Sequence, residues 1–222
     1  MSDPRSSLTR NSLTPAWFAG RSSVVKPLIR AATEQDAASI QQIYAPFCLN
    51  SAVSFEVQSP TGQEIQQRIQ KVTAQHPWLV CEAAGQVVGY AYACAHRERA
   101  AYRWAVDVAV YIGDGKRRSG IGRALYTSLF KVLALQGYYK AYAGITLPNP
   151  GSVGLHEAMG FTLVGVYRNV GYKAGAWRDV GWWALALQPE RDAPAEPRSV
   201  HTIQFTNEWV EALRAGQAHL RL

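Results

Sequence analysis

Residues 117–122 have the types and spacing of an anion-binding loop. Gly120 and Gly122 let a ligand approach the backbone, and Arg117 and Arg118 bring positive charge. A predicted helix follows directly, so the free N–H groups of its first turn and its dipole would face a negatively charged group. The GxGxxG dinucleotide pattern and the Gly-Lys-Ser/Thr ending of a Walker loop are both missing. An ordinary turn with a solvated basic face is the alternative, and we favour anion binding.

A second polar group lies on a short predicted helix. Asn149, Ser152 and His156 are spaced by three and four residues, which places them on one face of that helix. Histidine exchanges a proton near neutral pH, so this face is suited to acid–base chemistry beside a ligand. The alternative is a histidine that only satisfies a backbone carbonyl. With Asn149 and Ser152 beside it, we expect His156 to be catalytic or to line the site.

Asp107 stands alone in the apolar run AVDVAVYI, residues 105–112. A run of this kind predicts a strand that is buried on both faces. A carboxylate there costs on the order of several kcal/mol unless hydrogen bonds, an opposite charge or water satisfy it. We therefore expect Asp107 to be functional or tightly paired.

Hydrophobic periodicity predicts the elements that must hold these residues. Their order is β-α-α-β-β-β-α-β-α-β-β, which is mixed rather than alternating and favours an α/β fold with one mixed sheet and helices on both faces. The predicted strands are 28–32, 78–83, 86–95, 105–112, 140–147, 161–170 and 177–187, the last two separated by residues 172–176. The predicted helices begin after Thr33, Thr61, Gly122 and Asn149, and the third ends at Gly137.

The chain has 222 residues, 48% of them hydrophobic, which is enough for one sizeable core. No run approaches the ~20 apolar residues of a membrane-spanning helix, so we expect no membrane association. Cys48, Cys81 and Cys94 form no metal-binding or disulfide pattern. We therefore expect free thiols, no zinc site and a reducing, cytoplasmic location.

Changes in composition divide the chain into three parts. Residues 1–26 are Ser-rich without a secretory signal and predict a flexible arm, residues 27–188 form the domain, and residues 189–222 hold a Pro-rich linker and a short helix. We expect that helix to begin at Thr206 and end at Gly216, with Trp209, Val210 and Leu213 on its apolar face and a staple from Phe205 to Val210. Packing on its own domain is favoured over packing on a partner.

The run 110–122 resembles the [QR]-x-x-G-x-[GA] pyrophosphate loop of GNAT N-acetyltransferases, with Arg117, Gly120 and Gly122 at the defining positions. The segments PWLVCEAAGQVVGYAYA, RAAYRW, LYTSL, LPNPGSVGLHEAMGF and GYKAGAWRDVGWW are similar to the phosphinothricin acetyltransferase-like branch of that superfamily. The resemblance covers residues 27–188. It implies a V-shaped mixed sheet, acetyl-CoA as co-substrate, no metal, a primary amine as acceptor, and a homodimer.

The resemblance also implies roles for individual residues. The diphosphate and pantetheine arm would be held by Val110, Ile112, Arg117, Arg118, Ser119, Gly120, Ile121, Gly122, Arg123, Asn149 and Ser152. The Val110 N–H is the expected oxyanion donor. His156 stands where the superfamily commonly has a tyrosine that protonates the departing thiolate. Asp107 stands where it has a glutamate, and we expect Asp107 to take the proton of the amine, directly or through water, or to be structural.

The candidates for the acceptor pocket are Phe55, Tyr92, Arg99, Tyr102 and Lys173, and the alternative for each alone is an ordinary surface or core residue. Arg99 and Tyr102 fall in RAAYRW, which resembles a family segment near the substrate pocket. A guanidinium such as that of Arg99 is suited to a bidentate carboxylate contact. We expect the tryptophans at 177, 182 and 183 to contribute core or dimer-interface area.

The leading hypothesis is an enzyme that transfers acetyl directly from acetyl-CoA to the amine of a small amino acid analogue, of the phosphinothricin, methionine sulfone or sulfoximine type. A protein N-terminal acetyltransferase and a non-catalytic acyl-CoA sensor are the alternatives. A nucleic-acid partner is disfavoured, because the formal net charge of +7 is spread along the chain without an aromatic and basic reading surface.

Overall fold

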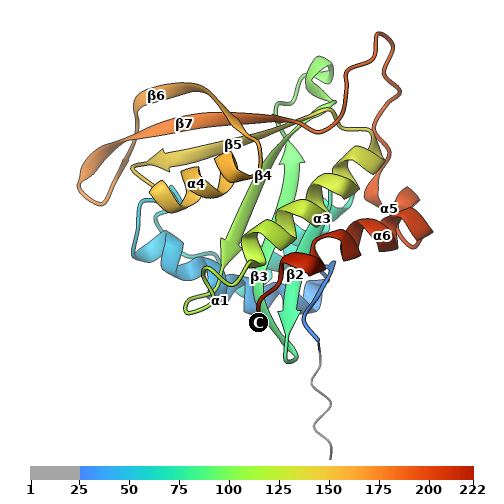
Figure 1. The fold of residues 1–222 in the computed structure, drawn as a ribbon. Coiled ribbons are helices and arrows are strands. Elements are labelled where there is room, and N and C mark those ends of the chain that lie inside the picture. Colours follow the sequence, from blue (N-terminus) through green and yellow to red (C-terminus); the bar gives the residue numbers. More distant parts are fainter. Residues whose placement is uncertain (1–25) are drawn as a thin grey trace, which may run out of the picture.

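A computed structural model describes residues 26–222, so the arm expected at 1–26 lies outside the described residues apart from Lys26. Seven strands form one sheet in the order β1-β2-β3-β4-β5-β7-β6, with helices on both faces (Figure 1). The strands are β1 Leu28–Ala31, β2 Trp78–Ala83, β3 Gln86–Ala95, β4 Ala105–Ile112, β5 Lys140–Leu147, β6 Thr162–Lys173 and β7 Ala176–Ala186. The α-helices are α1 Ala37–Leu49, α2 Gly62–Thr73, α3 Ile121–Gln136, α4 Pro150–Ala158, α5 Val200–Ile203 and α6 Asn207–Ala215, and the 3₁₀ turns are η1 Glu34–Asp36, η2 Ala100–Tyr102 and η3 Gln217–His219. The predicted fold class and element order are confirmed.

The sheet opens between β4 and β5. These two strands are parallel and pair only from Ala105↔Lys140 to Asp107↔Tyr142, although β4 continues to Ile112 and β5 to Leu147. Figure 1 shows β5, β6 and β7 fanning away from β2, β3 and β4. The V-shaped sheet is therefore confirmed. Beyond Asp107, the β4 edge that faces β5 is left without a strand partner, and its backbone groups are available to a ligand.

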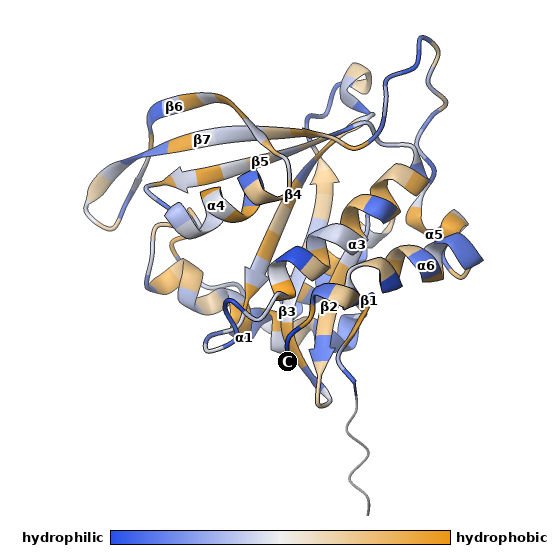
Figure 2. Cartoon of the chain, in the orientation of Figure 1, coloured by the Kyte–Doolittle hydropathy of each residue, from blue (hydrophilic) through white to orange (hydrophobic). Residues whose placement is uncertain are grey.

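Each face of the sheet carries its own apolar cluster. On one face, the fully buried Leu125, Leu129, Val132 and Leu133 of α3 pack on the sheet, as their helical spacing predicts. On the other face, α1 and α2 cover Trp78, Val80 and Tyr90 with residues such as Ile40, Ile65 and Ile69. In Figure 2 the central strands are largely hydrophobic, whereas the loop that leads into α3 is hydrophilic. The charged loop therefore lies at the rim of a two-sided core.

Local sequence signals account for most element ends. Thr61 and Glu64 form the predicted capping box of α2, and Gly137 ends α3 with φ 99°. The β6–β7 turn is shorter than predicted, because Ala174 and Gly175 alone form it with φ 52° and 74°. Two left-handed residues suit a tight hairpin. Alanine rarely adopts this conformation, so its residue type gave no signal.

The C-terminal segment packs on its own domain, as expected. Trp209 and Ala212 of α6 join Val200 and Ile203 of the unpredicted helix α5 in the core cluster of α3. Figure 1 shows α6 lying alongside α3. Thr206 caps α6 as predicted, by accepting a hydrogen bond from the Trp209 N–H. The boundary at residue 188 stays a prediction.

The predicted staple from Phe205 to Val210 is wrong. Phe205 has φ 72° and is 88% exposed, so its side chain points away from the helix it was expected to clamp. The apolar face of α6 uses Ala212 instead of Val210, which is partly exposed.

Within residues 26–222, no helix has the length and apolar character needed to span a bilayer. Cys48, Cys81 and Cys94 are free thiols. The same part of the chain holds no cluster of three or more histidine, cysteine or acidic side chains placed to bind a metal.

Candidate active site

Asp107 lies at the point where β4 and β5 diverge, and it is paired with a histidine. Its Oδ1 is 2.6 Å from the Nδ1 of His96, which follows β3. The two side chains are 27% and 12% exposed, respectively. Burial raises the pKa of Asp107, and the hydrogen bond from His96 opposes this rise. Val106 and Val108 of β4 are buried and the other β4 residues are partly buried, so neither face of the strand is exposed.

Sequence reasoning missed His96. Its ring stacks on Tyr142 of β5 with centroids 4.4 Å apart, and it meets Tyr102 and Trp182 edge-on at 5.9 Å and 6.1 Å. The available signal was strand periodicity: His96 comes two residues after Cys94, which pairs with Asp107, so the histidine continues the same face of the sheet.

The predicted anion loop ends at an uncapped helix. Gly120 is the N-cap of α3 with φ 82°, and no side chain accepts from the first turn. The N–H groups of residues 121–123 therefore have no partner within the helix. Arg118 has φ 63°, and the exposed Arg117 lies 3.6 Å from Asp114 and over the ring of Phe47. The loop has the free donors and the charge that were predicted.

The C-terminus touches this loop. The N–H of Arg221 donates to the carbonyl of Ser119 at 2.9 Å, and a Cβ at Gly120 would overlap the carbonyl oxygen of His219. Gly122 faces Leu155 of α4, and a Cβ added at this glycine would lie 3.0 Å from the leucine side chain. Glycine is thus required at 120 both for its φ value and for the approach of the tail.

The remaining predicted cofactor residues flank the opening of the sheet. Val110 and Ile112 lie on the part of β4 that has left β5. Ile121 is buried under the first turn of α3, and Arg123 is exposed on it. Asn149 caps α4 by accepting the Ser152 N–H at 3.1 Å.

His156 is 4% exposed, and both its ring nitrogens are paired inside the protein. Nδ1 is 2.8 Å from the Ser152 carbonyl, which can only accept, so Nδ1 donates and Nε2 accepts from the Tyr126 hydroxyl at 2.9 Å. Burial lowers the pKa of His156 and keeps the ring neutral. In this conformation a proton leaves or reaches His156 only through Tyr126 or Ser152, and its catalytic role stays a prediction.

Lys173 does not fit its expected contact with a substrate. Its buried amino group donates to three carbonyls, those of Cys48, Ser54 and Glu56, at 2.5–2.7 Å. All three N–H groups of a lysine are thereby used, so none is left for a substrate carboxylate. Lys173 instead ties the end of β6 to the loop after α1.

Phe55 belongs to the same loop. Its ring lies against the backbone of Gly171 in β6, where any Cβ would overlap it. Half-exposed, it remains available to a ligand on its other side. Tyr44 supports the loop by hydrogen bonds to Ser54 and Glu56 at 2.7 and 3.0 Å.

Tyr92 lines a groove of about 460 Å³ between α2 and the sheet. It stacks on Trp78, with centroids 4.4 Å apart, while Arg68 of α2 and Cys94 of β3 also line the groove. Cys94 pairs with Asp107, so this groove reaches the strand position beside the Asp107–His96 pair, which we call the dyad.

Arg99 and Tyr102 lie on the loop that connects His96 to β4. Arg99 is the N-cap of η2, is exposed, and makes no side-chain cap. The Tyr102 ring contacts His96 edge-on, so this part of the predicted acceptor set does lie beside Asp107. The structure thus brings Tyr102 and Asp107 together through a residue that was not predicted.

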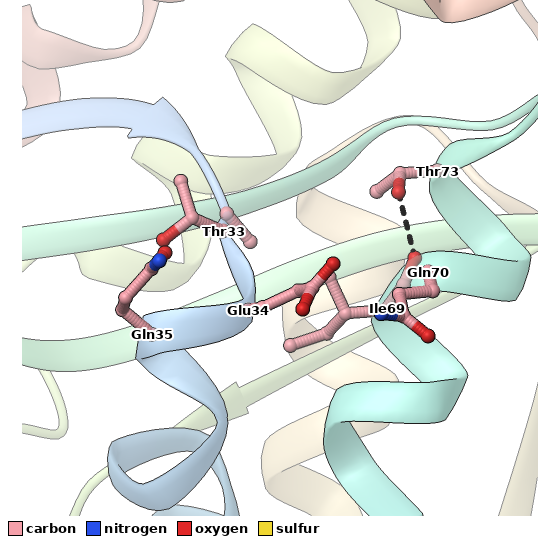
Figure 3. A pocket seen from close by; sticks show the side chains of 7 residues that line it. Thr33, Glu34, Gln35, Ile69, Gln70 and Thr73 are labelled. Carbon is pink, nitrogen blue, oxygen red and sulfur yellow. Dashed lines mark hydrogen bonds between the residues drawn. The ribbon is translucent and has the colours of Figure 1, made fainter.

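A second hollow, of about 350 Å³, lies between η1 and α2. Figure 3 shows Thr33, Glu34 and Gln35 on one side and Ile69, Gln70 and Thr73 on the other. The Thr73 hydroxyl donates a hydrogen bond to the Ile69 carbonyl oxygen at 2.7 Å. None of the predicted site residues lines it.

Comparison with known proteins agrees with this geometry. The family model described as "Acetyltransferase (GNAT) domain" matches residues 29–182. Phosphinothricin N-acetyltransferase of Streptomyces viridochromogenes is 41% identical over 175 residues, covering 79% of this chain and 93% of that protein. L-methionine sulfoximine/L-methionine sulfone acetyltransferase of Pseudomonas aeruginosa is 38% identical over 120 residues, covering 54% and 70%.

Among solved structures, a GNAT superfamily phosphinothricin acetyltransferase from Sinorhizobium meliloti in complex with AcCoA superimposes with a TM-score of 0.74 and 33% identity, covering 78% of this chain and 96% of that one. The fold and site define a protein with an opened mixed sheet and a basic, glycine-containing loop at a helix start. The chain belongs to the GNAT acetyltransferase family, on its phosphinothricin acetyltransferase-like branch.

Proposed function

We propose that the protein transfers acetyl directly from acetyl-CoA to the primary amine of a small amino acid or amino acid analogue. One observation carries this proposal. β4 separates from β5 after Asp107, continues to Ile112, and is followed by the loop that leads into α3. This arrangement offers a backbone edge for a thioester arm and free N–H donors for its diphosphate.

The residues present fit acetyl-CoA. The N–H groups of 121–123 and the charge of Arg117, Arg118 and Arg123 suit a diphosphate. Val110 and Ile112 lie on the free strand edge, and the Val110 N–H remains the proposed oxyanion donor. Asn149 and Ser152 at the start of α4 would flank the arm. When bound, acetyl-CoA supplies an acetyl group activated as a thioester.

The chain's own groups then have to move protons. An amine is mostly protonated near pH 7 and must lose a proton before it can attack a carbonyl carbon. Asp107 and its partner His96 lie where the sheet opens and are proposed as the site of proton uptake. His156 is proposed as the acid for the departing thiolate, and the Tyr126 hydroxyl that is hydrogen-bonded to its Nε2 is proposed to relay the proton.

The acceptor class follows from the relatives' names and from the groove beside Cys94. Two relatives act on phosphinothricin and on methionine sulfoximine or sulfone, all of which carry an α-amine and a carboxylate. A groove of about 460 Å³ has room for such a molecule. Arg99 is proposed to hold its carboxylate. Lys173 is left out of this set, because its donors are all used.

The test is release of CoA thiol from acetyl-CoA, measured with phosphinothricin, methionine sulfone, methionine sulfoximine and a peptide with a free N-terminus. N-acetylated methionine sulfone is the matched negative control, and protein without acceptor corrects for its three cysteines. We expect acceptor-dependent release with a small analogue and none with the blocked amine. Preference for the peptide would favour N-terminal acetylation. CoA binding without release from any acceptor would favour a sensor.

We also propose a homodimer formed through the β6–β7 hairpin. β6 is an edge strand, and the hairpin exposes Leu163, Val164, Tyr167, Val170, Tyr172 and Trp177. Exposed apolar side chains on an edge hairpin are typical of an interface. Sedimentation at micromolar concentration should give a dimer that Trp177→Lys weakens, and a monomer throughout would contradict it.

A cytoplasmic location likewise stays a proposal, compatible with three free thiols.

A further inference from the structure

We propose that His96, rather than Asp107, takes the proton from the ammonium group of the acceptor, and that Asp107 is the positioning residue that orients its imidazole. This inference deepens the proposed function and rests on it. It assigns a base to a residue that carries no role in the resemblance.

The pairing fixes which nitrogen of His96 is basic. An ionised carboxylate can only accept a hydrogen bond, so at 2.6 Å from Asp107 Oδ1 the Nδ1 atom must carry the hydrogen. Nε2 then holds the lone pair. Within residues 26–222, Nε2 makes no hydrogen bond, and the side chain is 12% exposed. A proton acceptor is thus presented away from the carboxylate.

The imidazole is held in place on three sides. Tyr142 stacks on its face at 4.4 Å, and Tyr102 and Trp182 meet it edge-on. These rings and the Asp107 bond fix both the plane and the rotation of the imidazole. Because the ring is fixed, the lone pair on Nε2 points in one direction, and the base needs little reorganisation when the acceptor binds.

The dyad lies where the acceptor has to meet the acetyl group. Asp107 and Tyr142 are the last residues to pair before β4 and β5 separate. Tyr102 connects the dyad to the predicted acceptor loop, and Cys94 connects it to the groove of about 460 Å³. His96 therefore contacts the loop that carries Tyr102 and directly follows Cys94 and Ala95, which line the groove.

The neighbouring groups leave His96 as the suitable base. Burial raises the pKa of the Cys94 thiol to about 11, which keeps it neutral. Tyr102 and Tyr142 are phenols, Arg97 is a cation that attracts the Asp107 carboxylate, and Trp182 does not titrate. The Asp107 oxygen that faces His96 is already taken up by the hydrogen bond from Nδ1, whereas the imidazole presents a second nitrogen that can accept a proton. His156 has no free nitrogen.

The proton balance is complete without a further reactant. The ammonium nitrogen gives one proton to His96 Nε2, and its freed lone pair forms the C–N bond while the C–S bond breaks. The nitrogen loses its second proton as the amide forms, and the departing sulfur takes up one proton. One proton per turnover passes to solvent, which returns His96 to its neutral form.

Four variants test the assignment in the full-length protein: His96→Gln, Asp107→Asn, the double variant, and His201→Gln as a matched control on α5. We expect His96→Gln to lower kcat by about 10²-fold or more, the usual effect of losing a general base. Asp107→Asn should lower kcat similarly, because the amide no longer fixes the Nδ1–H form. The double variant should be no more than about threefold worse than the poorer single one, since the two residues act as a unit.

Two readouts separate a base from a structural residue. For wild-type protein, kcat/KM should rise with pH on an acid limb that His96→Gln abolishes and the control keeps, while the Kd of CoA changes less than about twofold. Without any ligand, ¹⁵N NMR of histidine-labelled protein should show His96 with its hydrogen on Nδ1, and Asp107→Asn should remove that preference.

The outcomes separate this inference from the proposed function. His96→Gln with kcat within about threefold of wild type, or a His96 hydrogen on Nε2 in the wild-type spectrum, would overturn the inference alone. A large loss in Asp107→Asn with a normal His96→Gln would make Asp107 the base itself. Wild-type protein that binds CoA but acetylates no amine would overturn the proposed function, and the catalytic assignment of His96 with it.

Discussion

At the scale of single residues, polar groups hold the site in ways that residue type alone does not reveal. Asp107 was predicted because a carboxylate in an apolar strand needs a partner, but the partner itself, His96, comes from the loop that follows another strand, β3. Lys173 resembled a substrate contact, yet it binds three carbonyls. The sequence indicated that Asp107 needs a partner, and only the fold shows which atoms meet.

Lys173→Met should loosen the loop after α1. Three buried carbonyls would lose their donor, at a cost of about 1 kcal/mol or more each, so we expect the free energy of unfolding to fall by roughly 3 kcal/mol in urea titrations. Because Phe55 is on this loop, KM for the acceptor should rise while the Kd of CoA stays the same. The exposed Lys131→Met is the control. Unchanged stability would show that the carbonyls do not depend on Lys173.

His76 makes the fold sensitive to acid. Burial lowers its pKa from 6.5 to about 4, and it stacks on Tyr138. As the pH falls below 6.5, His76 becomes protonated in the unfolded chain but stays neutral in the folded chain until about pH 4. The free energy of unfolding therefore decreases as the pH falls through this window. The buried His156 acts in the same direction. Thermal melts from about pH 7 to about pH 4.5 should show a smaller loss for His76→Gln than for wild type, and parallel curves would contradict this interpretation.

At the scale of elements, local chemistry predicted caps and hairpins well, and long-range contacts escaped it. The capping box of α2 and the apolar face of α3 were confirmed because each depends on neighbours within one or two turns. The separation of β4 from β5 depends on how far two distant segments pair, so it came only through the resemblance. Helix α5 is four residues long, too short for a periodic signal.

Alanine variants of two glycines with similar φ values can separate the cost of backbone strain from the cost of contact with the C-terminal tail at the loop before α3. Gly115 has φ 73° with open space around it, whereas Gly120 has φ 82° and the His219 carbonyl against it. Gly115→Ala should cost about 1 kcal/mol, the strain of a left-handed alanine. We expect Gly120→Ala to cost clearly more and to weaken CoA binding several-fold. Equal effects in denaturation and calorimetry would show that the tail does not press on the loop.

At the scale of the whole molecule, the C-terminal segment extends the family fold. The match to the family ends at residue 182, yet α5 and α6 share the core of α3, and Arg221 donates to Ser119 in the proposed diphosphate loop. A change in composition marked this segment in the sequence as separate. Packing on its own domain was expected, but the contacts themselves could not be predicted, because the partners Ser128 and Leu213 meet across 85 positions.

The proposed coenzyme site is tested by a calorimetric titration of the folded wild-type protein with CoA. Uncapped N–H groups at the start of α3 and the open edge of β4 should give a saturable exothermic signal at one site per chain, and acetyl-CoA should compete for that site. Absence of heat and of competition, with a normal circular dichroism spectrum and melt, would contradict the assignment of this opening as the coenzyme site.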